Sequence, residues 1–166
     1  QKVSVTITGT NDVAVVTGDI TGTVLEGNIG DAAVTASGTL SITDVDADDA
    51  PSFADVTTKA GDNGLGNFVL VSGTWTYTLD QSKVQDLDQG DQVTDATTFI
   101  ASDNSTQKVS VTITGTNDVA VVTGDITGAV TEGNIGDAAV TANGTLSITD
   151  VDADDAPSFA DVTTKA

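Results

Sequence analysis

The chain of 166 residues contains no cysteine, no histidine and no methionine, and only two prolines. Without thiols or imidazoles it lacks the commonest protein nucleophiles and general bases, so we do not expect an enzyme. The missing cysteines also exclude disulfide bonds as a source of stability. No apolar run approaches the roughly 20 residues of a membrane-spanning helix, and no signal peptide is visible, so membrane insertion is not expected.

Basic residues are also scarce. The sequence has 5 lysines and arginines against 25 aspartates and glutamates, which gives a formal net charge of −20. Such a charge argues against binding to nucleic acid or to an anionic membrane. Glu26 and Glu132 are the only glutamates. An excess of aspartate indicates turns or oxygen ligands for hard cations, because the short carboxylate suits both.

The chain repeats itself with a period of 106 residues, so that Gln1 realigns with Gln107. Over the 60 positions that can be compared, three pairs differ: Thr23/Ala129, Leu25/Thr131 and Ser37/Asn143. A period of about 100 residues is the size of a domain and not of a solenoid repeat. The chain therefore spans about one and a half tandem repeats.

Hydrophobic residues alternate with polar ones at a period of two. The pattern predicts strands, separated by turns rich in Gly, Asn and Asp, and an all-β antiparallel sandwich. Only Asp80–Leu87 suggests a helical turn, with Ser82 as a possible N-cap. The predicted strands are Lys2–Thr8, Gly38–Thr43, Phe68–Val71, Gly73–Asp80, Thr98–Ala101, Lys108–Thr114 and one that begins at Val119–Val122.

The repeat divides the chain at two Asn-Asp pairs. We interpret residues 1–11 as the last strand of one repeat, 12–117 as a complete sandwich, and 118–166 as the first half of the next repeat. A half sandwich exposes its inner face and its edges. We therefore expect a neighbouring molecule to complete it, by strand exchange or by packing across the half repeat.

Three acidic sites recur within each repeat: the Asn-Asp pair, a lone glutamate, and the cluster DVDADD. Carboxylate, amide and carbonyl oxygens are the ligands of Ca²⁺, so these sites predict a calcium centre. An EF-hand is excluded, because Asp49 stands where the loop needs Gly and Pro51 interrupts it. Alternatively, the cluster is only a solvated acidic turn. The candidate ligands are Asn11, Asp12, Glu26, Asp44, Asp46, Asp48, Asp49, Asn117, Asp118, Glu132, Asp150, Asp152, Asp154 and Asp155.

The order of the motifs GTNDVAVVTGDITGTV, GTLSITDVDADD, GTWTYTLD and TITGTND resembles the VCBS-type repeat, a bacterial cadherin-like or Ig-like extender module. The resemblance covers the whole repeat. It implies a β-sandwich in a giant RTX-type adhesin, secreted by a type I system and held at the cell surface. It also implies folding and stiffening by Ca²⁺, contacts with adjacent identical repeats, and roles in attachment and biofilm formation.

The resemblance to cadherin junctions is looser. It implies that Glu26 corresponds to the glutamate of the first strand, that Asp44 and Asp46 correspond to the D-A-D segment, and that Asn117-Asp118 corresponds to the linker. Two features depart from the pattern: Ala14 and Ala120 replace the usual proline, and no D-R-E motif is visible. The RTX nonapeptide is absent as well.

A ligand-binding module, for carbohydrate or ice, is the alternative. It rests on the regular spacing of threonine, for example at Thr74, Thr76 and Thr78. Threonine is also an ordinary strand residue on a solvated face. Trp75 and Tyr77 could form a platform for a sugar, but their alternation with threonine favours positions in the core.

Overall fold

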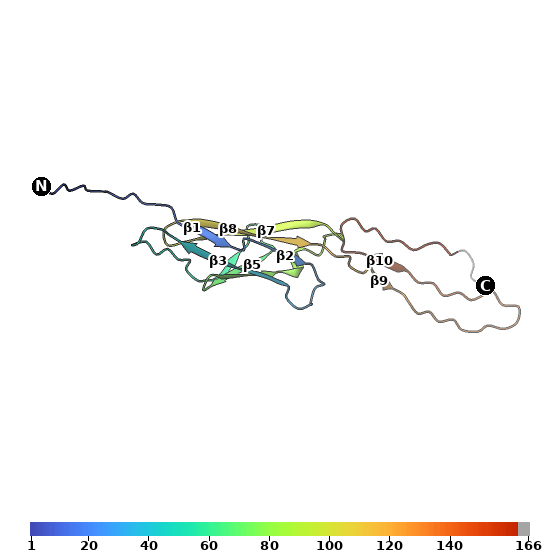
Figure 1. The fold of residues 1–166 in the computed structure, drawn as a ribbon. Helices are drawn as coiled ribbons and strands as arrows, with labels where there is room; N and C mark the ends of the chain where they lie inside the picture. The colour runs from blue at the N-terminus through green and yellow to red at the C-terminus, as the bar shows by residue number, and fades with distance from the viewer. Residues whose placement is uncertain (163–166) are drawn as a thin grey trace.

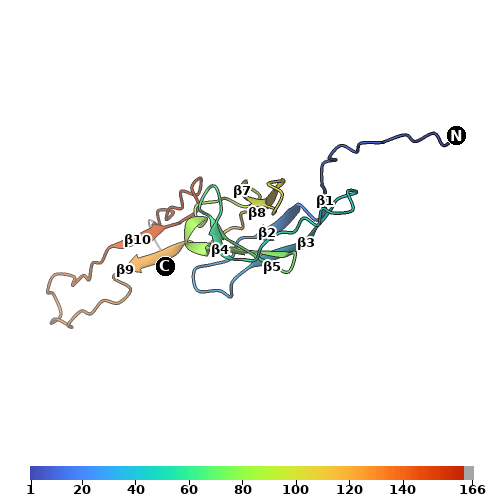
Figure 2. The same ribbon diagram turned by 90° about the vertical axis from the view of Figure 1, so that its left-hand side faces the viewer.

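The computed structural model describes residues 1–162 and shows an elongated molecule with a β-sandwich at its centre (Figure 1). An extended N-terminal segment leaves one end, and an open two-stranded ribbon leaves the other (Figures 1 and 2). The strands are β1 Val15–Gly18, β2 Thr21–Leu25, β3 Thr35–Thr43, β4 Val56–Ala60, β5 Gly66–Val71, β6 Thr74–Leu79, β7 Gln92–Ile100, β8 Thr106–Thr114, β9 Val121–Gly124 and β10 Leu146–Thr149.

Two sheets form the sandwich, which confirms the predicted all-β class. The first sheet has the order β1-β3-β6-β5-β4 and the second has the order β2-β8-β7, while β9 and β10 pair with each other. All these pairs are antiparallel except β2 with β8, which is parallel. The exception arises because β1 and β2 form one extended run that crosses between the sheets at Gly18, whose φ of +123° favours glycine.

The core lies between the two sheets and follows the predicted alternation. Trp75 and Tyr77 on β6 are fully buried, as expected of core residues, and Phe68 packs against Tyr77 with ring centroids 4.7 Å apart. On β8, every second residue from Val109 is fully buried. The period of two in the sequence, the burial of alternate residues and the packing of the two inner faces therefore agree.

A buried carboxylate organises the loop between β4 and β5. Asp95 on β7 is fully buried, and it accepts hydrogen bonds from the backbone N–H groups of Asn63 at 3.0 Å and of Leu65 and Gly66 at 3.1 Å. The Tyr77 hydroxyl donates to the same carboxylate at 3.3 Å. The loop and the adjoining end of β4 cover the free edge of β7, since Asp62 N and Asn63 Nδ2 in the loop and Lys59 Nζ on β4 donate to its carbonyls. Covering an edge in this way hinders unwanted strand pairing.

The helical turn predicted over 80–87 is shorter than expected. It is a 3₁₀ helix at Gln81–Lys83, and its N-cap is Asp80 and not Ser82. The Asp80 carboxylate accepts from the Ser82 amide at 3.1 Å and from its hydroxyl at 2.7 Å, and these bonds lower the pKa of Asp80. Among residues 1–162, no helix is long and apolar enough to cross a membrane.

The strand predicted at Lys2–Thr8 is not formed. The same sequence forms β8, where β2 and β7 hold it on both sides, but residues 1–10 have no such neighbours in this chain. In the second repeat, β9 and β10 are the two strands formed within residues 118–162. The rest of the interval 118–166, residues 163–166, lies outside the described residues.

Candidate cation site at the junction between repeats

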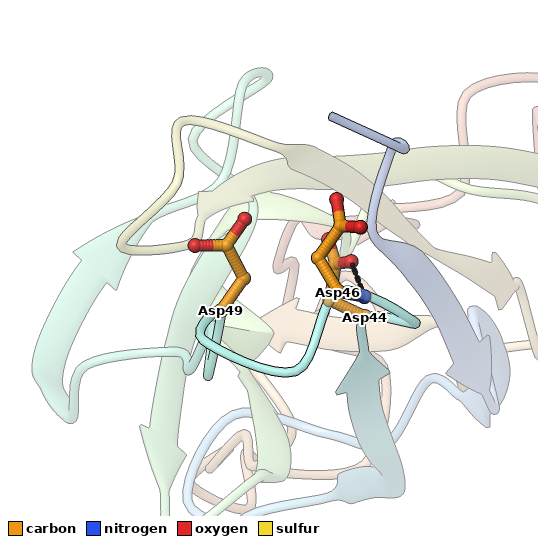
Figure 3. A group of neighbouring side chains, drawn as sticks. All are labelled: Asp44, Asp46 and Asp49. Carbon is orange, nitrogen blue, oxygen red and sulfur yellow. Dashed lines mark hydrogen bonds between the residues drawn. The ribbon is translucent and has the colours of Figure 1, made fainter. Parts of the chain in front are cut away.

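The acidic loop that follows β3 turns three carboxylates toward one another (Figure 3). One oxygen from each of Asp44, Asp46 and Asp49 lies within 4.8 Å of the other two. Two hydrogen bonds shape the loop: the Asp46 amide donates to Asp44 Oδ1 at 2.8 Å, and the Asp49 amide donates to the Asp46 carbonyl at 3.1 Å. The loop is therefore a turn that gathers like charges on one side.

The second copy of the motif has the same arrangement. Asp150, Asp152 and Asp155 bring one oxygen each within 4.8 Å of one another. Three oxygens that are at most 4.8 Å apart can all lie within about 2.8 Å of a common point, and Ca²⁺ takes oxygen ligands at about 2.3–2.6 Å. The group is therefore compact enough for one cation to contact all three carboxylates.

The Asn-Asp linkers are hydrogen-bonded to these clusters. The Asp12 amide donates to Asp46 Oδ2 at 2.7 Å, and the Asp118 amide donates to Asp152 Oδ2 at 2.9 Å. In each linker the side-chain amide of the asparagine, Asn11 or Asn117, donates to the carbonyl of the following aspartate. We call the region around Asn11-Asp12 the upstream junction and the region around Asn117-Asp118 the downstream junction.

Glu26 approaches the downstream junction from the preceding repeat. Its Oε2 accepts from the Thr116 amide and its Oε1 accepts from Gln85 Nε2, both at 3.1 Å. Burial raises the pKa of Glu26, and the carboxylates of Asp118, Asp152 and Asp86 raise it further, against the lowering effect of the Thr116 hydrogen bond. The glutamate of one repeat thus lies close enough to the aspartates of the next for their charges to affect its pKa.

Burial distinguishes the downstream junction from the upstream one. Asp118 and Asp152 are only 8% and 4% exposed to solvent, whereas the equivalent Asp12 is exposed and Asp46 is half-buried. Asp118 Oδ2 and Asp152 Oδ1 are buried without a hydrogen-bond partner among the described residues. Burial and the charges of Asp152 and Asp150 raise the pKa of Asp118. Two unpartnered buried carboxylate oxygens are costly unless a cation binds them.

The preceding repeat contributes residues that the sequence did not single out. The Ala153 amide donates to the Asp86 carbonyl at 3.3 Å, and the Asp154 amide donates to Asp88 Oδ1 at 3.1 Å. Asp88 also lines a cavity together with Asp91, Asn117 and Asp152. The acidic sequence DLD at 86–88, which follows the 3₁₀ helix, is the signal that could have revealed them.

Glu132 lies apart from both junctions, whereas Asp48 and Asp154 lie outside the groups of three carboxylates but line cavities beside them. Glu132, the copy of Glu26 in the second repeat, is exposed in the open ribbon, where no complete sandwich follows it within the chain. Asp48 does not belong to the group formed by Asp44, Asp46 and Asp49, and Asp154 does not belong to its copy. Asp154 instead contacts the preceding repeat through its backbone.

The donor set at the downstream junction consists of oxygen atoms. It can bind a hard cation, and it brings together carboxylates from two repeats across a short linker.

Neither a scan against protein-family models nor a search of curated proteins finds a match for this chain.

Proposed function

We propose that this chain is a calcium-stabilised extender module of a bacterial cell-surface adhesin, in which bound Ca²⁺ stiffens the joint between successive repeats. The observation that carries the proposal is the pair of buried, unpartnered oxygens of Asp118 and Asp152, which lie where two repeats meet. A rigid spacer requires stiff connections between its repeats, and these two carboxylate oxygens lie at such a connection.

The residues that would hold the ion come from both sides of the linker. Glu26 belongs to the preceding repeat, Asp118 to the linker, and Asp150, Asp152 and Asp155 to the following repeat. The ion would supply positive charge and coordination bonds that connect the two repeats. Hydrogen bonds from Thr116 and Gln85 orient the Glu26 carboxylate, and the Asp118 amide orients Asp152.

Without a cation, the same residues repel one another. Burial and, to a smaller extent, neighbouring charges raise the pKa values of Glu26 and Asp118, and for Glu26 these charges include Asp118 and Asp152 across the junction, so docking disfavours its ionised form. A cation that binds only when the two repeats are docked would stabilise the docked state by mass action. Extracellular calcium is concentrated enough to occupy even weak sites, with dissociation constants of about 10⁻⁴–10⁻³ M. This supports a location outside the cell, where calcium would replace disulfides as the stabilising element.

The resemblance to VCBS-type repeats supports the wider biological setting. It favours secretion by a type I system, retention at the bacterial surface, and a role in attachment and biofilm formation, with adjacent repeats as the immediate partners. The near identity of the two repeats supports a spacer, because a recurring unit adds length and leaves ligand recognition to other domains.

A ligand-binding module remains the second candidate, on one observation. Thr74, Thr76 and Thr78 pair with Thr39, Ser37 and Thr35, and these six residues give the outer face of the first sheet a regular array of hydroxyl groups. A sugar platform made of Trp75 and Tyr77 is excluded, since both side chains are fully buried. The array alone also fits a solvated strand surface.

Calcium titration of the full chain tests the proposal. We expect calorimetry to detect a stronger site at the downstream junction and a weaker one at the upstream junction, where the preceding repeat contributes only residues 1–10. Small-angle scattering should give a longer and less variable particle in Ca²⁺ than in chelator, together with a higher melting temperature. Identical scattering and melting in both conditions would show that the aspartates are only solvated turns.

A further inference from the structure

A mainly apolar cavity lies beside the acidic cluster at the downstream junction. It has a volume of about 290 Å³, and residues of both repeats line it. Its lining includes Ile29 and Gln85 of the preceding repeat, and Asp118, Val119, Val121 and Val151 of the following repeat. We call Val119, Val121 and Val151 the valine notch. The two repeats therefore meet at an apolar surface as well as at an acidic one.

The loop between β2 and β3 carries Ile29 to this cavity. Figure 1 shows the loop at the end of the sandwich from which the ribbon of β9 and β10 leaves. The Ile29 amide donates to Gln85 Oε1 at 3.2 Å, and the Gly27 amide donates to Gln81 Oε1 at 3.0 Å. The backbone of the loop is thus held by two glutamines, yet the Ile29 side chain is 71% exposed. Ile29 is available for an apolar contact.

The exposure of the valine notch does not depend on the later strands of its own repeat. Val15, the copy of Val121 in the complete sandwich, is 56% exposed, and Val121 itself is 57% exposed. Val151 is 56% exposed, whereas its copy Val45, at the upstream junction, is 79% exposed. The sandwich in front of Val151 therefore covers part of the notch already.

We propose that Ile29 fills the valine notch when two repeats dock, and that this apolar contact fixes the rotation of one repeat about the linker. The proposal rests on the proposed function only in that successive repeats dock at this joint, and the contact itself needs no cation. A cation between the carboxylates ties the repeats together at one place, about which a short linker can still turn. A second contact beside the cation removes that freedom.

The notch and the acidic cluster support each other because they are adjacent. Asp118 lines the same cavity as Ile29, and its carboxylate is buried. Ile29 in the notch excludes water from this side of Asp118, and a lower local dielectric constant strengthens the attraction between a carboxylate and a cation. Filling the notch should therefore raise the affinity for a cation, and a bound cation should favour filling of the notch by the same factor.

Both repeats carry the two parts of this contact. Val13, Val15 and Val45 stand in the first repeat where the valine notch stands in the second, and Ile135 is the copy of Ile29. The isoleucine of one repeat contacts the notch of the next, so the contact is head-to-tail and can recur at each joint of a tandem array.

The distance between two spin labels tests the proposal, since the chain has no cysteine that would compete for labelling. The labels replace Thr57 on β4 and Ser147 on β10, which are exposed residues of the two repeats. The distribution of distances gives the ratio of docked to undocked joints and the spread of the docked state. It is measured in excess calcium, and in chelator at high ionic strength, which screens the acidic charges.

Ile29→Ser removes the apolar side chain from an exposed position, so this variant should keep its fold. Burying an isoleucine side chain shifts an equilibrium roughly ten- to hundredfold. We expect the ratio of docked to undocked joints to fall about tenfold in chelator, and the distances in calcium to spread more widely. Ile29→Leu should stay within about twofold of the wild type. Ile100→Ser is the matched control, because Ile100 is 61% exposed at the other end of the sandwich.

A double-mutant cycle with Val121→Ser identifies the partner of Ile29. The two substitutions should be non-additive, because either one alone removes the contact, whereas Ile29→Ser and Ile100→Ser should add. Docking of Ile29→Ser equal to the wild type in both conditions, or additive effects with Val121→Ser, would overturn the proposal. If calcium changes nothing but Ile29→Ser still reduces docking, the notch is supported and the cation at the joint is refuted.

Discussion

Replacing Asp152 by asparagine should change the joint between repeats in opposite directions with and without calcium. Asp152→Asn keeps the shape of the side chain and an oxygen that can accept from the Asp118 amide, but it removes one negative charge. In chelator, this charge strengthens the hydrogen bond that Oδ2 accepts from the Asp118 amide at 2.9 Å, but it also repels the neighbouring carboxylates, and its Oδ1 atom has no partner. In calcium, the same charge attracts the ion. The sign of the effect therefore reports whether a cation binds there.

The distances in the cluster set the size of both effects. Oxygens of Asp150 and Asp152 lie within 4.8 Å of each other. Two unit charges at that distance repel by about 0.9 kcal/mol in water and about 3.5 kcal/mol at an effective dielectric constant of about 20. Because Asp150 and Asp152 share one loop of the second repeat, Asp152→Asn should relieve roughly 1–3 kcal/mol of repulsion within that loop. It should also favour docking, because it removes one of the charges that raise the pKa of Glu26 across the junction.

The loss in calcium should be larger. A divalent ion about 2.5 Å from a carboxylate oxygen gains about 3.3 kcal/mol from one negative charge, even at the dielectric constant of water. Because each 1.4 kcal/mol changes an affinity about tenfold, the dissociation constant of the downstream site should rise by about two orders of magnitude.

Two measurements check these values. Isothermal titration calorimetry gives the calcium affinity, and the spread of distances between one spin label on each side of the junction gives the docked population. Asp46→Asn is the matched control, because Asp46 occupies the same place at the upstream junction. It should leave the stronger site unchanged. If Asp152→Asn leaves the calcium affinity unchanged, or if Asp46→Asn weakens the stronger site equally, the assignment of that site is wrong.

Three further predictions concern stability and pH. Asp95→Asn replaces one acceptor of a buried carboxylate that holds the β4–β5 loop, so chemical denaturation should show a loss of about 3–5 kcal/mol; Asp62→Asn is a control on the same loop. Gly38→Ala should cost about 1–3 kcal/mol in the same assay, because the added carbon would lie 2.8 Å from the Trp75 ring. In chelator, docking measured with the spin labels should strengthen as the pH falls from 7 toward 4.5, the ordinary pKa of Glu26, because its pKa is raised in the docked state and protonation removes the repulsion. In excess calcium the trend should reverse, because protons compete with the ion; a trend of the same sign in both conditions would contradict the role of Glu26.

Local sequence patterns predicted β3, β5, β6 and β8 well, because these strands have a buried face and a solvated face, but they did not predict β4 and gave only the end of β7. Phe68 and Leu70 on β5, and Trp75 and Tyr77 on β6, illustrate this, since each pair is two residues apart and buried in the core. The parallel pairing of β2 with β8 could not be predicted in this way. It depends on the crossing between sheets at Gly18, and a period of two says nothing about which partner a strand selects.

The acidic site was only partly predictable for a similar reason. Asp44, Asp46 and Asp49 gather through hydrogen bonds within one short loop, so the sequence reveals them directly. Asp86 and Asp88 reach the junction through the fold of the preceding repeat. The same limit explains segment 1–10, whose strand pattern is correct but whose neighbours are missing. A pattern specifies what a segment can form, and its contacts decide what it does form.

The distribution of charge explains why the joint is the part of the chain that should respond to cations. Within residues 1–162, Asp95 is the one acidic residue located in a strand, and it is buried and fully hydrogen-bonded by a loop. The other acidic residues lie in loops and linkers, and in a sandwich the loops gather at the two ends. Stacking such modules end to end would bring acidic loops of neighbouring repeats together, as with Asp88 and Asp154 at the downstream junction. Each added repeat therefore adds one repulsive joint, and the stiffness of a long array should depend on the cation at every joint more than on the stability of the individual sandwiches.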